Sequence, residues 1–563
     1  MKKQSNSKIF LIMHVFLILN TLIFWSIRSM WSGIIAIAGK PVPYILMAVL
    51  AITTLTVSIC SLYKKRPLAL TIFGSVLDII FLGLHGYMLS VTQDSWSYFV
   101  REFLYEIVFI ATIVFIIFLI FYSQNIHWLH KKWLPPVYGT LFLIIGFFSI
   151  YDISLIHGIE KTPVVYSVED TYQITFTTKA KGEAWVVIDG VEYNDTYAGY
   201  RKSEDTIHKI TVPAEALDTA GSYTVYTRAM YLRGPYCALQ GSTISETYNW
   251  RGVDTSNDLQ YYAISDNHLT TKATADAANY WGDKLDFLLI LGDTANWIDS
   301  ENELALTLHL ASDITHGEIP VIYARGNHET KGVVADEYHK YVGSKNENYY
   351  YTFRIRNIWG IVLDVGEDHE DSHWEFSDMA RFDAYRSEQL AFLDEVIANS
   401  DTEYNAEGVD YRIGLCHIPL TFVKEDDPLQ DQKFAWVERL NQMNLDVFFS
   451  GHRHELMFAD ANLEAGSTYT TTSDYNGTGK ATTYLMSGAN FPNVLVSKRG
   501  QSQLYSEKEN VFGKYFIGVA ASMNANETIL KFTNESGEII ETISPWFENI
   551  NYGKEIHIKN KGN

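Results

Sequence analysis

Apolar and polar positions divide the chain into a first part with long apolar runs and a longer second part with short alternating segments. Five apolar runs of about 20 residues each have the length that a helix needs to cross the hydrocarbon core of a membrane. They cover residues 9–27, 44–63, 68–89, 103–122 and 136–155. The first run is alternatively a signal peptide, but no small-x-small cleavage site follows it and four further runs come after it. We therefore predict a transmembrane domain with five spans over residues 1–157.

The basic residues between these runs predict the orientation of the spans, because cytoplasmic loops carry an excess of Lys and Arg. The clusters fall on one side of the predicted membrane: Lys2, Lys3 and Lys8, then Lys64, Lys65 and Arg66, then Lys131 and Lys132. This places the N-terminus in the cytoplasm. After an odd number of spans, the rest of the chain lies outside a multi-pass plasma-membrane domain.

Two polar residues, Asp78 and His85, interrupt the third run with a spacing of close to two helical turns. Both side chains can then face the interior of the helix bundle. Ionisable groups at that depth are costly and often functional. A hydrogen-bonded pair that holds the helices together is the other interpretation, and both stay open.

The second part of the chain shows two different patterns. Residues 161–252 alternate apolar and polar positions over 172–177, 184–188, 208–212 and 222–231, with Gly, Asp and Asn between them. This pattern is typical of a β-sandwich, here predicted as similar to a fibronectin type III domain. Residues 257–546 alternate apolar strands with helical patterns, which predicts layered β-sheets flanked by helices. Residues 547–563 are predicted to be a polar tail.

The charge distribution restricts the kind of partner. Residues 1–155 contain 11 Lys or Arg against 5 Asp or Glu, whereas the remainder contains 33 against 61. The acidic second part has no basic stripe, so we expect no nucleic acid as a substrate. The three cysteines, Cys60, Cys237 and Cys416, form no recognisable disulfide framework.

Candidate metal ligands follow five predicted strands of the second part. The strands cover residues 259–264, 287–291, 320–323, 411–416 and 445–450. The ligands that follow them are Asp266 and His268, Asp293, Asn327, His417, and finally His452 and His454. Carboxylate oxygen and imidazole nitrogen together suit zinc, iron or manganese better than calcium or magnesium. Seven ligands are too many for one tetrahedral ion, so two ions that share a ligand are expected.

Each motif alone is weak, since a single histidine after a strand is more often a structural residue. In this order, the five motifs resemble the calcineurin-like metallophosphoesterases, whose pattern is Asp-x-His, Gly-Asp, Gly-Asn-His-Asp/Glu, His and Gly-His-x-His. The resemblance covers residues 258–500 and includes every ligand position. It implies a first ion on Asp266, His268 and His454, a second on Asn327, His417 and His452, and Asp293 as the bridge.

The resemblance also implies a mechanism. Two divalent or mixed-valence ions (Fe, Mn or Zn) about 3.5–4 Å apart supply a bridging hydroxide and hold the phosphoryl oxygens during in-line attack. His328 would protonate the leaving group, a step worth roughly 10² to 10⁴ in rate. Glu329 would fix the orientation and charge of His328 from behind. Arg453 is a candidate substrate contact, with a solvent-facing role as the alternative.

A β-sandwich before the catalytic domain is also similar to the organisation of purple acid phosphatases. Those enzymes carry a tyrosine ligand three residues after the bridging aspartate and lack the histidine of Asp-x-His. Here Asn296 and His268 occupy these positions, which predicts a colourless or weakly coloured enzyme. Cys416 is expected to be a packed thiol that points away from the metals, because neighbours in a strand face opposite sides.

The expected function is a membrane-anchored extracytoplasmic phosphatase or phosphodiesterase. Its substrate would be a small phosphoester, or a lipid-linked phosphate, because five spans exceed what an anchor needs. The alternative is a membrane sensor or transport component whose outer domain binds a phosphorylated ligand without turnover. That alternative predicts a missing bridge or acid, yet Asp293 and His328 are both present.

Overall fold

The computed structural model describes residues 158–197, 199–233, 238–454, 456–461, 464–473, 480–496, 498–499, 516–540 and 554–561. Within these ranges no helix combines the length and the hydropathy that crossing a bilayer requires. The five predicted spans, Asp78 and His85 lie outside the described residues. The described residues of His157–Asp299 and Glu303–Asn563 belong to one compact unit.

Residues 164–249 consist mainly of strands. The strands are β1 (Val164–Val168), β2 (Thr171–Ile188), β3 (Val191–Asn194), β4 (Thr196–Tyr197), β5 (Arg201–Lys202), β6 (Asp205–Pro213), β7 (Ser222–Arg233), β8 (Ala238–Gln240) and β9 (Ile244–Asn249), with the short helix α7 (Ala214–Ala220) after β6. The first half of β2 pairs with β1 and β6, and its second half pairs with β3 and β7. One long strand thus replaces the two that the sequence predicted at 172–177 and 184–188.

This strand region has a core of its own, in which alternate residues of β2 such as Tyr172, Ile174 and Phe176 pack with Trp250. It is also joined to the rest of the unit by main-chain pairing. Strand β1 lies parallel to β12 (Pro320–Tyr323), with Val165 opposite Pro320 and Tyr166 opposite Val321. The strand region therefore continues the sheet that carries the candidate ligands.

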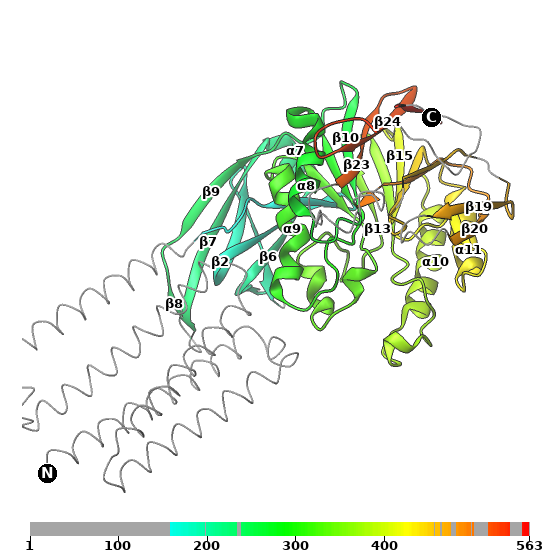
Figure 1. The fold of residues 1–563 in the computed structure, drawn as a ribbon. Coiled ribbons are helices and arrows are strands. Elements are labelled where there is room, and N and C mark those ends of the chain that lie inside the picture. Colours follow the sequence, from blue (N-terminus) through cyan, green and yellow to red (C-terminus); the bar gives the residue numbers. More distant parts are fainter. Residues whose placement is uncertain are drawn as a thin grey trace, which may run out of the picture. The chain divides into compact units, whose positions relative to one another are not determined.

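Two sheets form the centre of the part of the unit that follows β9 (Figure 1). The first contains β10 (Leu259–Ile264), β11 (Phe287–Ile290) and β12 in parallel, followed on the β10 side by antiparallel β23 (Phe516–Met523), β24 (Glu527–Asn534) and β25 (Ile556–Lys559). The second has the order β13 (Tyr351–Ile355), β14 (Ile358–Leu363), β15 (Tyr411–Cys416), β17 (Val447–Ser450), β21 (Asn493–Leu495) and β18 (Met457–Ala459).

The two sheets share one apolar core. Alternate residues of the first sheet, such as Tyr261 and Leu289, pack with Phe353, Leu415 and Phe449 of the second. Helix α8 (Thr271–Ala278) contacts β10 and β23 on the far side of the first sheet, and α9 (Glu301–Thr315) precedes β12. Helices α10 (Phe382–Ala398) and α11 (Gln430–Leu440) cover the second sheet. The layered α/β arrangement predicted from the sequence is confirmed for this region.

The C-terminal residues differ from the expectation. Residues 547–563 were expected to form a polar tail, but Ile556–Lys559 is strand β25 and pairs with β24. Ile556 and Ile558 are buried in the shared core, whereas His557 and Lys559 face outward. Four residues are too short for this alternation to stand out in a polar sequence. A three-stranded sheet of β16 (Phe422–Lys424), β20 (Lys480–Met486) and β19 (Thr468–Ser473) completes the described strands together with β22 (Lys498–Arg499).

Candidate metal centre

The strand ends place the predicted ligands in an unusual backbone conformation. The φ angles of Asp266, His268, Asp293, His452 and His454 are 52°, 40°, 54°, 68° and 53°. A left-handed conformation at a residue other than glycine costs about 1–3 kcal/mol, and such residues cluster at functional sites. The turns after β10, β11 and β17 therefore hold these side chains in place at the expense of local stability.

Glycines in the motifs allow the strand ends to approach one another. A Cβ atom on Gly292 would lie 2.0 Å from the amide nitrogen of Gly326, and one on Gly326 would lie 2.2 Å from Oδ1 of Asp293. A Cβ on Gly451 would lie 2.0 Å from Oγ of Ser265. All three contacts are too short for any side chain. The motif glycines thus set how closely the ligands of neighbouring strands can converge.

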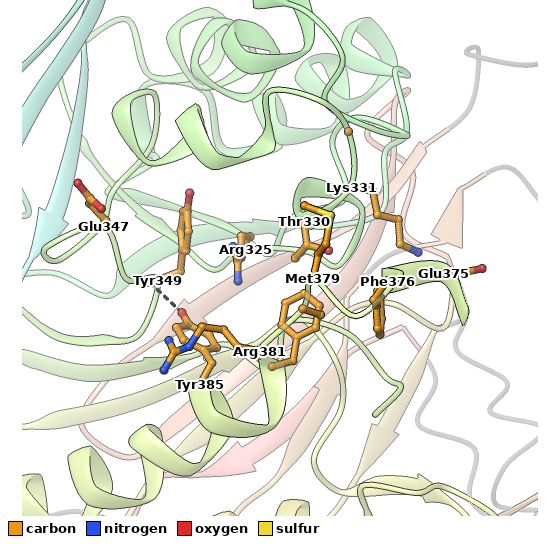
Figure 2. A pocket seen from close by; sticks show the side chains of 13 residues that line it. Arg325, Thr330, Lys331, Glu347, Tyr349, Glu375, Phe376, Met379, Arg381 and Tyr385 are labelled. Carbon is orange, nitrogen blue, oxygen red and sulfur yellow. Dashed lines mark hydrogen bonds between the residues drawn. The ribbon is translucent and has the colours of Figure 1, made fainter. Parts of the chain in front are cut away.

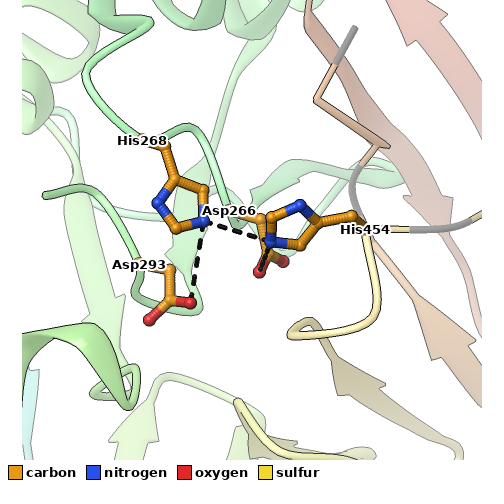
Figure 3. Close-up of side chains that lie close together, drawn as sticks. All are labelled: Asp266, His268, Asp293 and His454. Atoms are coloured by element: carbon orange, nitrogen blue, oxygen red, sulfur yellow. Dashed lines mark hydrogen bonds and ion pairs between the residues drawn. The ribbon is translucent and has the colours of Figure 1, made fainter. Parts of the chain in front are cut away.

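One group of candidate ligands consists of Asp266, His268, Asp293 and His454, whose ligand atoms all lie within 4.8 Å of one another (Figure 3). Nε2 of His268 is 3.1 Å from Nε2 of His454 and 3.8 Å from Oδ2 of Asp293. Nε2 of His454 is 3.3 Å from Oδ1 of Asp266. Ligands on a tetrahedral ion with bonds of about 2.1 Å are separated by roughly 3.4 Å, so these spacings suit one ion.

A second group consists of Asp293, His417 and His452, whose ligand atoms also lie within 4.8 Å of one another. Nε2 of His417 is 3.2 Å from Oδ2 of Asp293. Asn327 lies beside this group, with its Oδ1 3.0 Å from Nδ1 of His452. Asp293 belongs to both groups. The structure therefore brings all seven predicted ligands together, in the two sets that the sequence analysis described.

Outer hydrogen bonds decide which ring nitrogen of each histidine faces the centre. Nδ1 of His268 donates to Oδ1 of Asn296 at 2.9 Å, and Nδ1 of His417 donates to the carbonyl oxygen of Leu291. Nε2 of His452 donates to Oδ2 of Asp368 at 3.2 Å. A neutral imidazole carries one hydrogen. In the neutral form of each ring, the opposite nitrogen therefore has a lone pair that points inward.

These lone pairs face other electron-rich atoms. Nε2 of His417 points at the Asp293 carboxylate, is buried, and makes no hydrogen bond. Nδ1 of His452 faces the amide oxygen of Asn327. Contacts between two acceptors in a buried site are unfavourable unless a cation or a proton lies between them. The donor set therefore fits divalent metal ions, with nitrogen and oxygen ligands that suit zinc, iron or manganese.

The carboxylates of the site remain ionised. Burial acts to raise the pKa of Asp266, but the neighbouring histidines, above all His454, outweigh burial and hold the pKa at about 2. Burial opposes ionisation of Asp293 in the same way, and His417 and other imidazoles lower its pKa well below the usual range. Both aspartates are thus in the form that binds a metal ion.

The imidazoles respond to burial differently. Burial lowers the pKa of His268 to about 4 and that of His452 to about 4. Burial also acts to lower the pKa of His417, but Asp293 reverses this and raises the pKa to about 10. Two ligand histidines are therefore neutral at pH 7. His417 carries the proton that a metal ion would replace.

His328 and Glu329 follow the ligand Asn327 in the short helix η2 (His328–Thr330). Nδ1 of His328 donates to the carbonyl oxygen of Asn296 at 2.6 Å, and its Nε2 lies 3.9 Å from Oδ2 of Asp293. The side chain is 32% exposed, so a ligand can reach it. The ring of His328 thus presents Nε2 to the centre.

Glu329 was expected to orient His328, and the structure gives it another task. Its buried carboxylate accepts hydrogen bonds from the main-chain N–H groups of Asp293, Thr294 and Gly326, at 2.8, 2.8 and 3.1 Å. Burial and the nearby Asp293 charge raise its pKa to about 7. Glu329 therefore holds the turn that carries Asp293, whereas the carbonyl group of Asn296 orients His328.

Sequence reasoning missed two acids that follow β14. Asp368 contacts His452, and Glu367 accepts a hydrogen bond from Nδ2 of Asn327 at 3.2 Å and pairs with Lys331 at 2.7 Å. Carboxylates that orient metal ligands are common behind metal sites. Neither acid belongs to a motif, and the only signal in the sequence is their position after a buried strand.

The remaining predicted residues have clear positions. The guanidinium group of Arg453 lies 5.8 Å from the ring centre of Tyr484, and its buried Nε makes no hydrogen bond. Cys416 is buried in the apolar cluster between β15 and the helices, as predicted, and burial raises the pKa of its thiol. Asn296, at the position of the purple-phosphatase tyrosine, supports His268 from outside.

Comparisons with known proteins agree with this site. Residues 259–456 match the family model for the calcineurin-like phosphoesterases. No curated protein matches the chain significantly. Among solved structures, the comparison finds a purple acid phosphatase, PPD1, from yellow lupin (Lupinus luteus) seeds. It is 12% identical, the match covers 70% of this chain and 74% of that chain, and the TM-score is 0.43.

Two further solved structures are similar at the same low level. PhoD is 11% identical over 66% of this chain and 85% of its own, with a TM-score of 0.36. GAP50, described as the anchor in the inner membrane complex of Plasmodium, is 12% identical over 50% of this chain and 87% of its own, with a TM-score of 0.29. At these TM-scores the three structures support nothing beyond the family match.

Proposed function

We propose that this chain, a member of the calcineurin-like metallophosphoesterases by its domain at residues 259–456, hydrolyses phosphoesters at two metal ions that share Asp293. The domain makes the protein a metal-dependent phosphoester hydrolase. The observation that carries the two-ion centre is the division of the ligands into two groups with Asp293 in common. Asp266, His268 and His454 would hold one ion, and Asn327, His417 and His452 the other.

Two ions at these ligands would lower the pKa of a bound water to about 7 and would neutralise the negative charge of the phosphoryl oxygens. The other tasks belong to the chain. A water molecule that has lost a proton to the solvent attacks as hydroxide: its oxygen forms a new P–O bond to phosphorus, and the ester P–O bond breaks, which leaves an alkoxide. His328 gives the proton on Nε2 to this alkoxide, because its Nδ1 is already bound to the carbonyl group of Asn296. Arg453 contacts a phosphoryl oxygen from the turn between two ligands.

The assay for this function uses the full-length chain in detergent, loaded with manganese, zinc or iron. Turnover of 4-nitrophenyl phosphate and bis(4-nitrophenyl) phosphate is compared with that of Asp293→Asn, and of Asp276→Asn as a control at an exposed salt bridge with Lys272. We expect only Asp293→Asn to lose activity. Binding of a phosphorylated ligand by a wild type that hydrolyses neither ester would favour the sensor function instead.

The location of the enzyme is part of the proposal. The five apolar runs over residues 9–155 and the basic loops between them support a multi-pass anchor with the catalytic domain outside the cytoplasm. The substrate is then a small phosphoester or a lipid-linked phosphate at the outer leaflet. A reporter that is active only in the cytoplasm, fused after residue 160, should give no signal. A signal from this fusion would reverse the orientation.

A further inference from the structure

A cavity of about 520 Å³ is lined in part by Thr330, Lys331 and Gly332, the residues that follow His328 and Glu329 in the chain. Figure 2 shows Tyr349 and Tyr385 on one side of it and Phe376 and Met379 on the other. Pockets of about 300–1,000 Å³ are typical of small-molecule sites. Neither the ligand motifs nor the proposed reaction accounts for this one.

Part of the cavity wall directly follows the proposed proton donor His328 in the chain. Thr330, Lys331 and Gly332 line the cavity and directly follow His328 and Glu329 in the chain. The amide of Lys331 donates to the carbonyl oxygen of His328 at 3.2 Å, and Oγ1 of Thr330 donates to the carbonyl oxygen of Asn327 at 2.7 Å. The cavity therefore begins within one turn of the proposed proton donor, on the chain segment that also supplies a metal ligand.

The cations that line the cavity already have partners. Arg325 pairs with Asp364 at 2.6 Å and lies over the ring of Tyr349, with 4.2 Å to its centre. Lys331 pairs with Glu367 as described, and Arg381 pairs with Glu388 at 2.6 Å. Because each of these cations is already paired with a carboxylate, they do not indicate an anionic ligand. Besides the carboxylates of Glu347 and Glu375 at its edge, the cavity offers a ligand aromatic and aliphatic surface.

Exposed apolar side chains also occur next to lining residues in the chain or on a loop that is hydrogen-bonded to them. Met379 is 88% exposed and Trp374 is 78% exposed, and both flank Phe376 in the chain. Val333 and Trp297 are exposed as well, on two loops that are joined by a hydrogen bond from the amide of Ile298 to the carbonyl oxygen of Lys331. Exposed apolar groups are a feature of binding surfaces.

We propose that this cavity receives the apolar leaving group of the substrate. The substrate is then an amphiphilic phosphoester, with its phosphate at the metal ions and an alkyl or aryl body against Phe376, Met379 and Tyr385. This inference rests on the proposed function, because it is His328 that places the departing oxygen next to the cavity. It adds a substrate class that the ligand set alone does not provide.

The test is a series of n-alkyl phosphates from methyl to hexyl, hydrolysed by the metal-loaded full-length chain. The alkoxides are similar in basicity along the series, so the chemical step changes little. Burial of a methylene is worth about 0.8 kcal/mol, which is about fourfold in kcat/KM for each added carbon. Phenyl and naphthyl phosphates form a parallel arm that separates aryl from alkyl preference.

Two variants locate the effect. Met379→Ala removes apolar surface at the rim and should reduce the gain for each methylene. Ala380→Phe fills part of the cavity and should end the gain at a shorter chain. Tyr200→Ala is the matched control, because Tyr200 is 82% exposed and does not line the cavity. Tyr200→Ala should show the same gain in kcat/KM for each methylene as the wild type.

A calorimetric titration with methylphosphonate and hexylphosphonate, which are not hydrolysed, measures binding without turnover. We expect hexylphosphonate to bind more tightly to the wild type, and Ala380→Phe to remove that difference. If kcat/KM does not change from methyl to hexyl phosphate in an enzyme that hydrolyses 4-nitrophenyl phosphate, the cavity proposal is refuted and the proposed function stays intact. If no ester is hydrolysed, the proposed function fails, and equal binding of the two phosphonates then overturns the cavity proposal as well.

Discussion

Asp368 provides a sharp test of how the centre is built. Its Oδ2 accepts the hydrogen bond from Nε2 of His452 at 3.2 Å, and this bond leaves Nδ1 of the ring directed at Asn327. Asp368→Asn keeps the size of the side chain and removes its charge. Without the carboxylate, the ring of His452 is free to turn or to place its hydrogen on the nitrogen that should bind the metal.

The expected loss follows from the strength of this bond. A hydrogen bond to a charged group contributes about 1.5–3 kcal/mol. Because the carboxylate of Asp368 is 23% exposed, water screens the interaction and the lower end of this range applies. About 1.4 kcal/mol corresponds to a tenfold change in affinity. This agrees with losses of roughly 10- to 100-fold when a group behind a metal ligand is replaced.

Competition with a chelator measures the affinity for each ion. We expect Asp368→Asn to weaken the ion at Asn327, His417 and His452 about tenfold and to leave the other ion unchanged. Glu370→Gln is the control, since it removes an exposed charge from the same loop. Equal affinities in wild type and Asp368→Asn would show that Asp368 does not orient His452, and would refute the reasoning.

Three further predictions concern the proton donor His328, the motif glycine Gly451 and Lys209. His328→Ala should lower kcat for alkyl phosphates by roughly 10²- to 10⁴-fold. The loss should be much smaller for 4-nitrophenyl phosphate, because its leaving group needs no proton. Equal losses for both substrates in steady-state assays would contradict the role of His328 as proton donor. Gly451→Ala places a Cβ 2.0 Å from Oγ of Ser265 and should abolish metal binding in a titration, whereas Gly537→Ala, in open space, should retain it. Burial lowers the pKa of Lys209 to about 7 in the folded protein, whereas in the unfolded chain the pKa is about 10.4. Between these pH values the unfolded state binds more protons, so the free energy of unfolding rises with pH by up to about 1.4 kcal/mol per pH unit. Lys209→Met should remove this part of the increase between pH 7 and 9, measured by thermal unfolding.

The sequence predicted those parts of the fold that depend on local pattern. Strands β10, β12 and β15 have the predicted bounds because short apolar runs end there in polar motifs. The pairing of β1 with β12 could not be predicted, since it joins residues more than 150 positions apart through main-chain groups. The continuity of β2 was hidden by its polar middle, near Gly182, where the register shifts.

The same limit applies to the site. The seven ligands were predicted because each follows a strand in a recognisable motif. Asp368 and Glu367 were missed because their importance comes from distances to His452 and Asn327, which no spacing reveals. Glu329 was identified, but its partners are main-chain amides on another turn, and only the folded structure brings that turn to it.

The central claim is that two ions share Asp293. Electron paramagnetic resonance of the manganese-loaded full-length chain, together with metal analysis, tests it most directly. We predict two manganese ions per chain with the spectrum of an exchange-coupled pair, and loss of the coupling in Asp293→Ala. One uncoupled ion per wild-type chain would contradict the account.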